Sequence, residues 1–265
     1  MGLLGADEPP PVEVLNPGAA APVVLACEHA GRTIPRRLGD LGLPPAEMDR
    51  HIAWDIGAAA VARRMAAGLD ACLVLQRYSR LVVDCNRPRE ASDAIPTVSD
   101  GTRVPANVGL KEAEREARWH EIHEPFHAAL SAQLEARRHM ETAALSLITV
   151  HSFTPHLDGV RRPWALGLLR RHDQGLAARL MEALHEQAPD ETIAINRPYD
   201  IDDLTDYTIP VQAERRGLPN VLIEIRNDLI ADEAGQAHYA DMLVAAIRTT
   251  LGCHSDDRNG WISMT

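Results

Sequence analysis

Short apolar runs alternate along the chain with longer stretches in which apolar residues recur every three or four positions. The short runs are rich in β-branched residues, which is typical of buried strands. They lie within residues 23–27, 71–87, 145–150, 165–169, 191–199 and 220–229. The periodic stretches predict helices over residues 55–65, 111–140, 174–187 and 233–250. This alternation predicts an α/β fold, as a single domain with a mixed, mostly parallel sheet and helices on both faces.

Some segments lack this alternation of strand and helix patterns, and one segment allows two assignments. Residues 1–22 are rich in Pro, Gly and acidic side chains, and we expect them to form a mobile N-terminal arm. Residues 71–87 hold two apolar runs, which predict two strands or one long bent strand. Residues 90–109 carry Pro, Asn, Ser and Gly without an apolar period, which predicts a long surface loop. The folded domain is therefore expected over residues 23–252, with a C-terminal tail over residues 253–265.

Length, charge and cysteine usage narrow the class of protein. The 265 residues suffice for one large α/β domain, and 45% of them are hydrophobic. The formal net charge of −11 argues against nucleic acid and anionic membrane surfaces as partners, because both require a basic face. The four cysteines form no CxxC pair, and neither an export signal nor a run of about 18 apolar residues is found. We therefore expect a cytoplasmic protein that does not span a membrane.

Polar residues that can carry chemistry follow the predicted strands or lie near their ends. They are Glu28, His29, Asp84, Asn86, Arg87, His151, Glu224 and Arg226, with Asp55 at the head of the first predicted helix. Sites in open α/β sheets form at the carboxyl ends of the strands. These residues lie in segments far apart in the sequence. Because the carboxyl ends of parallel strands lie at one edge of the sheet, we expect their side chains to meet there.

The residue types in this set suit metal-assisted hydrolysis. Two histidines with one carboxylate can hold a catalytic zinc ion, which keeps a fourth position open for water. Glu224 is the candidate general base, because a charged side chain between Ile223 and Ile225 requires a partner. Strand alternation also permits a simpler interpretation, in which Glu224 and Arg226 face solvent on one side of the sheet.

A second group of histidines lies in the sequence HEIHEPFH, residues 120–127. It resembles the zincin motif HExxH, but its second histidine comes one residue too early. His123 and His127 are four residues apart, a spacing that can chelate a metal on a helix. Pro125 between them should distort that turn. We therefore expect a packing or solvated role for this pair.

Six short motifs, taken in order, resemble those of the N-formylglutamate amidohydrolase family. They are ACEHAGRTIP, HIAWDIGA, YSRLVVDCNRP, VHSF, NRPYD and RGLPNVLIEIRNDL, and the match runs from about residue 23 to residue 251. The family is similar in fold to the zinc carboxypeptidases and the muramoyl-alanine amidases, a phosphorylase/hydrolase-like arrangement. The resemblance therefore implies a zinc enzyme built on the α/β fold that the strand pattern predicts.

The resemblance also implies roles for individual residues. It implies His29, Asp55 and His151 as zinc ligands, with Glu28 as the alternative acidic ligand. It implies Glu224 as the general base. The DxNR pattern is similar to the carboxypeptidase segment that holds a substrate carboxylate, which implies Asn86 and Arg87 as its binders. Arg80 or Arg226 is expected to stabilise the oxyanion of the reaction.

These inferences combine into one expected function. We expect the domain over residues 23–252 to use Zn²⁺ to hydrolyse a small-molecule N-acyl amino acid, such as N-formylglutamate. A carboxypeptidase-like or cell-wall-amidase-like hydrolase is one alternative, although the absence of an export signal counts against it. A catalytically silent binding protein for an amino-acid derivative is another, although such a protein needs no water-activating base. The sequence does not indicate an oligomeric state.

Overall fold

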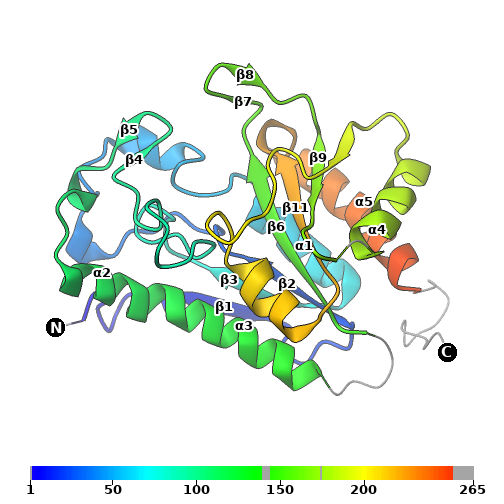
Figure 1. Cartoon of the computed structure of the whole chain (residues 1–265), viewed down its shortest axis with the longest axis horizontal. Coiled ribbons are helices and arrows are strands. Elements are labelled where there is room, and N and C mark those ends of the chain that lie inside the picture. The colour runs from blue at the N-terminus through cyan, green and yellow to red at the C-terminus, as the bar shows by residue number, and fades with distance from the viewer. Residues whose placement is uncertain (1, 139–143, 174, 253–265) are drawn as a thin grey trace.

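The computed structural model describes residues 2–138, 144–173 and 175–252 and contains a seven-stranded central sheet (Figure 1). The strands lie in the order β1-β3-β2-β6-β11-β9-β10. Their bounds are β1 Val12–Leu15, β2 Val23–Cys27, β3 Cys72–Gln76, β6 Ser146–Phe153, β9 Leu166–Leu169, β10 Ile193–Ile195 and β11 Asn220–Arg226. Two small antiparallel pairs lie outside this sheet: β4 (Val98–Ser99) with β5 (Thr102–Arg103), and β7 (His156–Leu157) with β8 (Val160–Arg161).

The sheet is mixed and mostly parallel, as predicted. Strands β3, β2, β6 and β11 run parallel to one another, whereas β1 is antiparallel to β3 and β9 is antiparallel to β11. At the far edge, β10 runs parallel to β9. The parallel arrangement places the carboxyl ends of β2, β6 and β11 at one edge of the sheet, where a site is expected.

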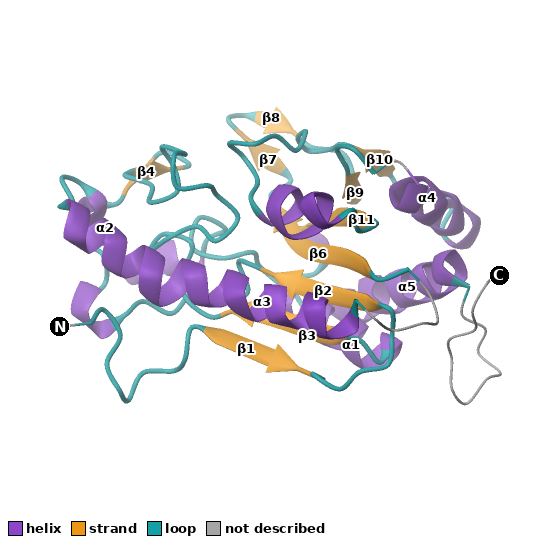
Figure 2. Cartoon of the chain, turned by 60° about the horizontal axis from the view of Figure 1, so that its bottom comes forward, coloured by secondary structure: helices purple, strands orange, loops and turns teal. Residues whose placement is uncertain are grey.

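Helices cover both faces of the sheet (Figure 2). One face packs against α1 (Ala58–Leu69), α4 (Gly175–Gln187) and α5 (Glu233–Leu251) in one apolar core cluster. The other face packs against α3 (Glu124–Arg137) in a second apolar cluster. Alternate residues of β2 enter the two clusters, with Leu25 in the first and Val24 in the second, as the period of a strand requires. No helix of the described residues is long and apolar enough to cross a membrane.

The helix predicted over residues 111–140 forms as three consecutive segments. They are α2 (Glu112–Arg118), a π-helical segment (Trp119–His123) and α3, and the end of the predicted range lies outside the described residues. The amide of Glu124 donates to the carbonyl of Trp119, a bond that spans five residues instead of four. Pro125 follows at once and has no N–H to donate, which agrees with the distortion expected there.

The prediction of a mobile arm over residues 1–22 is wrong for much of that segment. Residues 12–15 form the edge strand β1, paired with β3, and the hydroxyl of Tyr78 donates to the carbonyl of Pro9 at 2.8 Å. Pairing with an open sheet edge gives this segment backbone hydrogen bonds that its Pro-rich composition does not reveal. The predicted tail over residues 253–265 lies outside the described residues.

The prediction of strands through residues 71–87 is correct only for β3. Leu81, Val82 and Val83 are fully buried, but they form turns without a strand partner. Their carbonyls are satisfied by side chains, since Asn107 donates to Leu81 at 2.8 Å and Arg118 to Val82 at 3.0 Å. The predicted loop over residues 90–109 contains β4, β5 and one turn of 3₁₀-helix.

Candidate active site

The predicted site residues meet at the carboxyl edge of the sheet. His29 follows β2, His151 lies in β6, and Glu224 lies in β11 directly beside His151 in the parallel register. Asp55 precedes α1, and its amide donates to the carbonyl of His29 at 3.0 Å. Gly57 lets α1 begin at Ala58 because it adopts a φ of 80°, where a side chain would also strike the carbonyl of Ile230.

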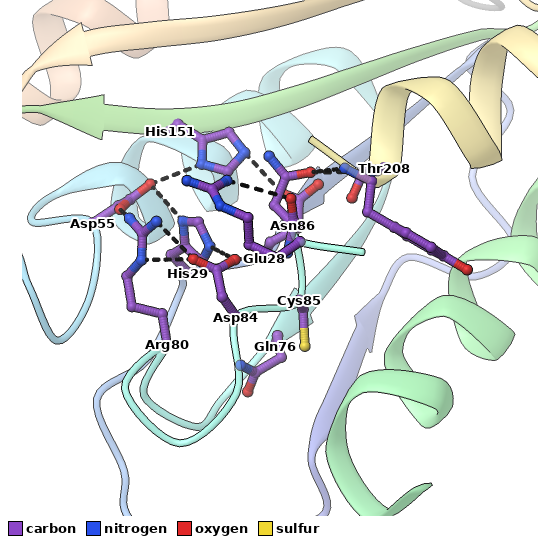
Figure 3. Close-up of polar contacts among 12 residues, drawn as sticks. Glu28, His29, Asp55, Gln76, Arg80, Asp84, Cys85, Asn86, His151 and Thr208 are labelled. Carbon is purple, nitrogen blue, oxygen red and sulfur yellow. Dashed lines mark hydrogen bonds and ion pairs between the residues drawn. The ribbon is translucent and has the colours of Figure 1, made fainter. Parts of the chain in front are cut away.

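Two imidazoles converge on one carboxylate oxygen (Figure 3). The Nδ1 atom of His29 lies 3.3 Å from Oδ2 of Asp55, and Nδ1 of His151 lies 2.8 Å from the same oxygen. All three side chains are buried, and their potential ligand atoms lie within 4.8 Å of one another. Donors of a tetrahedral zinc site lie about 3.3 Å apart, because each bond is about 2.0–2.1 Å long. The donor set therefore fits a zinc ion.

Each histidine also faces a second carboxylate on its other nitrogen. The Nε2 atom of His29 donates to Oδ1 of Asp84 at 2.7 Å, and Nε2 of His151 lies 3.0 Å from Oε2 of Glu28. Carboxylates behind histidines fix the tautomer and ring orientation of metal ligands and leave the opposite nitrogen free to bind. Glu28 therefore lies behind His151, whereas Asp55 lies between the two Nδ1 atoms as the acidic member of the cluster.

The buried charges balance one another. Burial alone would raise the pKa of Asp55, but the two imidazoles lower it below its usual range. Burial acts likewise on Asp84 and Glu28, yet Arg80 lowers the pKa of Asp84 and His151 lowers the pKa of Glu28. Burial would lower the pKa of His151, but Glu28 and Asp55 raise it well above its usual value. The carboxylates of the cluster thus stabilise a positive charge placed between them. A bound divalent cation would supply that charge.

Glu224 differs from the other carboxylates of the site. Its side chain is only 5% exposed, and its Oε2 atom has no hydrogen-bond partner within the part of the chain that the structure describes. Burial raises its pKa to about 7, although His151 and Arg80 oppose the shift. A carboxyl group with this pKa exchanges a proton near neutral pH, as a general acid or base must.

A cavity of about 230 Å³ opens beside this cluster. Of the residues predicted as ligands, base or substrate binders, all except Arg226 and the alternative ligand Glu28 line it: His29, Asp55, Arg80, Asn86, Arg87, His151 and Glu224. Arg226 is instead bound to Asp228, at 2.8 Å, and to the carbonyl of Pro163, at 3.3 Å. Alternation places Glu224 and Arg226 on one face, but two residues along a strand span about 6.6 Å, which carries Arg226 past the cavity. The structure therefore does not bring Arg226 into the cavity with the other predicted residues.

Arg80 and Asn86 line the cavity, but their polar groups are already engaged. Arg80 donates to Oδ2 of Asp84 through Nε and Nη2, at 3.0 and 2.7 Å, and lies 3.3 Å from Asp55. The side-chain oxygen of Asn86 accepts from the amides of residues 207 and 208, at 3.1 and 3.0 Å, and its Nδ2 donates to Asp206 at 2.9 Å. These contacts do not support the prediction that Asn86 binds a carboxylate directly, since its amide ties two loops together.

Arg87 retains some freedom to bind an anion. Its Nε atom donates to the exposed carboxylate of Asp93 at 2.9 Å, and Nη1 donates to the carbonyl of Thr205. The side chain of Asp93 is exposed, so water can solvate it when a substrate carboxylate takes its place at Arg87. The structure therefore leaves Arg87 available as a carboxylate binder.

The cavity residues that were not predicted as site residues include His51, Arg162 and Tyr199. His51 and Tyr199 fall within the quoted motifs HIAWDIGA and NRPYD, so the motifs contained that signal. Arg162 follows β8 in a segment without any apolar pattern, so the sequence offered none. Within the described residues, no carboxylate lies at ion-pair distance from Arg162, and its guanidinium carbon lies 6.0 Å from the ring centre of Phe153.

A buried carboxyl group beside a cluster of side chains that could hold a metal ion, with a cavity open to both, is typical of metal-assisted hydrolases. The chain belongs to the N-formylglutamate amidohydrolase family, whose model matches residues 21–231. No curated protein matches it significantly.

Two solved structures share the fold over nearly their whole length. The gene product Atu2144 from Agrobacterium tumefaciens is 40% identical, with a TM-score of 0.90 over 94% of this chain and 98% of that chain. The N-formylglutamate amidohydrolase from Ralstonia eutropha JMP134 is 22% identical, with a TM-score of 0.63 over 91% of this chain and 97% of that chain. Family and fold together establish an enzyme of the amidohydrolase type.

Proposed function

We propose that this protein is a zinc-dependent amidohydrolase that releases the free amino acid from a small N-acyl amino acid such as N-formylglutamate. One observation carries the proposal: the Nδ1 atoms of His29 and His151 face the same oxygen of Asp55, and Glu224 lies beside them with a free carboxylate oxygen. The family to which the chain belongs supports hydrolysis of an amide as the reaction.

His29, Asp55 and His151 would hold the zinc ion, which when bound supplies a Lewis acid and lowers the pKa of water. Glu224 accepts a proton from the attacking water at Oε2 and delivers it to the leaving amine nitrogen. Its pKa of about 7 suits both transfers at neutral pH. Glu28 and Asp84 hold the two imidazoles in the orientation that directs Nδ1 toward Asp55.

Three arginines at the cavity have different roles in substrate binding and charge neutralisation. Arg87 binds the α-carboxylate of the amino acid in place of Asp93. Arg80 mainly neutralises Asp84 and Asp55 and so stabilises the buried cluster. Arg162 lines the cavity without a carboxylate partner among the described residues, so it is the cation best placed to meet a second acidic group of the substrate.

The reaction is tested with a screen of N-formyl, N-acetyl and N-succinyl derivatives of acidic and neutral amino acids on the zinc-loaded protein. We expect release of the free amino acid, fastest for one acyl group. Glu224→Gln keeps the shape of the side chain but loses the proton acceptor, so its kcat should fall by about 10²-fold or more while zinc content stays at wild-type level. Hydrolysis that survives in Glu224→Gln would remove Glu224 as the base, and loss of zinc in that variant would make it a ligand.

The screen also separates the alternatives. Release of C-terminal residues from peptides, without action on N-acyl amino acids, would favour a carboxypeptidase-like enzyme. Tight binding of an amino-acid derivative without any turnover would favour a binding protein. The raised pKa of Glu224 counts against the latter, because burying an unpaired carboxyl costs free energy that binding alone does not require.

A further inference from the structure

Two histidines of the helical segment behind the site are bound to the loop that carries Arg87. The Nε2 atom of His127 donates to the carbonyl of Cys85 at 2.7 Å, and Nε2 of His123 donates to the carbonyl of Arg87 at 3.1 Å. Residues 84–88 belong to no strand, so these carbonyls have no partner in the sheet. The two bonds therefore fix the backbone on both sides of Asn86.

The histidines are held rigidly and in one protonation state. Burial lowers the pKa of His127 to about 4 and that of His123 to about 3, so both rings are neutral at pH 7. A neutral imidazole has a single N–H, and here a carbonyl accepts it. Trp119 stacks on His123 with ring centres 3.6 Å apart, while Gln212 lies 3.4 Å from Nδ1 of His127. Neither ring can turn without losing these contacts.

The same two rings also contact a second loop at the cavity, the one that contains Thr205 and Tyr207. Tyr207 packs edge-on against both histidines, with ring centres 5.0 and 4.5 Å away. Its amide donates to the side-chain oxygen of Asn86, which links it to the loop of Arg87. The histidine pair thus lies under the junction of the two loops, and Arg87 of the first lines the cavity while its Nη1 atom reaches a carbonyl of the second.

We infer that His123 and His127 are positioning residues for substrate binding: through two backbone carbonyls they set the place of Arg87, and thereby of the substrate carboxylate. The inference rests on the proposed function in one respect, that Arg87 binds a carboxylate. A shift of about 1 Å in a group that orients the substrate is enough to cost about 10²-fold in rate, so two hydrogen bonds remote from the reaction can influence it.

The experiment compares Met and Gln at each position. The two side chains have similar length and volume, but only Gln can donate to the carbonyl. We expect His127→Met and His123→Met to raise KM for N-formyl-L-glutamate by about 10-fold, with a smaller change in kcat and unchanged zinc content. We expect His127→Gln and His123→Gln to recover most of the wild-type KM.

Two controls separate positioning from stability. His120→Met alters a histidine of the same helix whose side chain is exposed and faces Glu116 and Glu124, so its KM should equal that of the wild type. The second control is a substrate whose α-carboxylate is replaced by a carboxamide. Since Arg87 gains nothing from its carboxylate there, the Met variants should treat this substrate as the wild type does.

The outcomes distinguish this inference from the proposed function. If the wild type hydrolyses N-formyl-L-glutamate no better than its carboxamide, the role of Arg87 in the proposed function fails. If the wild type prefers the carboxylate and the Met variants keep that preference with an unchanged KM, the positioning role is overturned. Met variants that do not fold, beside folded Gln variants with wild-type KM, would assign the bonds to stability and also overturn it.

Discussion

The protein contains two buried pairs of histidines that are alike in geometry and opposite in chemistry. His29 and His151 come from strands far apart in the sequence, and their ring centres lie 5.0 Å apart. His123 and His127 lie one helical turn apart, with ring centres 4.5 Å apart. Only the second pair has the sequence spacing of a helical metal motif, yet only the first pair belongs to a group that could hold a metal among the described residues.

The acceptors around the rings explain the difference. The first pair faces Asp55, Asp84 and Glu28, whose charges raise the pKa of both imidazoles against the effect of burial. The second pair donates to neutral carbonyls, and burial lowers the pKa of both rings because it outweighs the opposing effects of those hydrogen bonds and of Asp84 and Glu28. The charge of the acceptors, rather than the spacing of the histidines, decides whether a buried pair can take up a cation.

Removal of a ring from the first pair should have the largest effect. His151→Ala removes one of three candidate ligands, and we expect zinc content to fall and kcat/KM to drop by about 10³-fold, because a metal Lewis acid contributes several kcal/mol. Elemental analysis and steady-state kinetics measure both. Full zinc occupancy in His151→Ala would end the assignment of this cluster as the metal site.

The carboxylates behind the first pair come next. Glu28→Gln and Asp84→Asn remove the charge that each imidazole faces on Nε2 while they keep the shape of the side chain. We expect each to weaken zinc affinity by about 10- to 100-fold, as partners behind metal ligands typically do. Competition with a chelator of known affinity gives the value. Wild-type zinc affinity in both variants would show that the charge of the acceptors does not explain why one histidine pair can bind a metal and the other cannot.

A change at Arg87 tests the loop that the second pair supports. Arg87→Lys replaces a planar fork by a point charge, so a bidentate contact with a carboxylate is lost. We expect KM to rise about 10-fold with little change in kcat. Saturation curves for N-formyl-L-glutamate measure this directly. Unchanged kcat/KM would exclude Arg87 from substrate binding and leave Arg162 as the candidate cation.

A last comparison concerns the pH dependence of stability instead of activity. An unfolded histidine has a pKa near 6.5, whereas burial lowers that of His127 to about 4. Below pH 6.5 the unfolded chain therefore binds more protons, and the free energy of unfolding falls toward pH 4 by up to about 1.4 kcal/mol per pH unit for this residue. His127→Gln should flatten the profile by that slope, as measured by urea unfolding of the chelator-treated proteins. Parallel profiles would mean that His127 has the same pKa in the folded and the unfolded chain.

The sequence predicted the part of the site that depends on strand ends. His29, His151 and Glu224 were found because apolar runs locate buried strands, and parallel strands end at a common edge. Residues 81–83 were misassigned as part of a strand. A buried apolar run has the same sequence pattern whether its carbonyls bind a neighbouring strand or side chains such as Arg118. Arg162 was missed because its place depends on how β7 and β8 reach the cavity, which no local pattern records.

The five-residue π-helical segment Trp119–His123 lets this helix hold one residue more between two of its contacts than a regular α-helix would. In a regular α-helix, residues five positions apart point roughly 140° away from each other. The wider turn brings Arg118 and His123 round to the same side, where they reach the carbonyls of Val82 and Arg87. Deletion of exposed His120 would restore regular winding and leave these two residues four positions apart, a spacing that a regular helix also places on one side. Both hydrogen bonds should therefore survive the deletion of this residue.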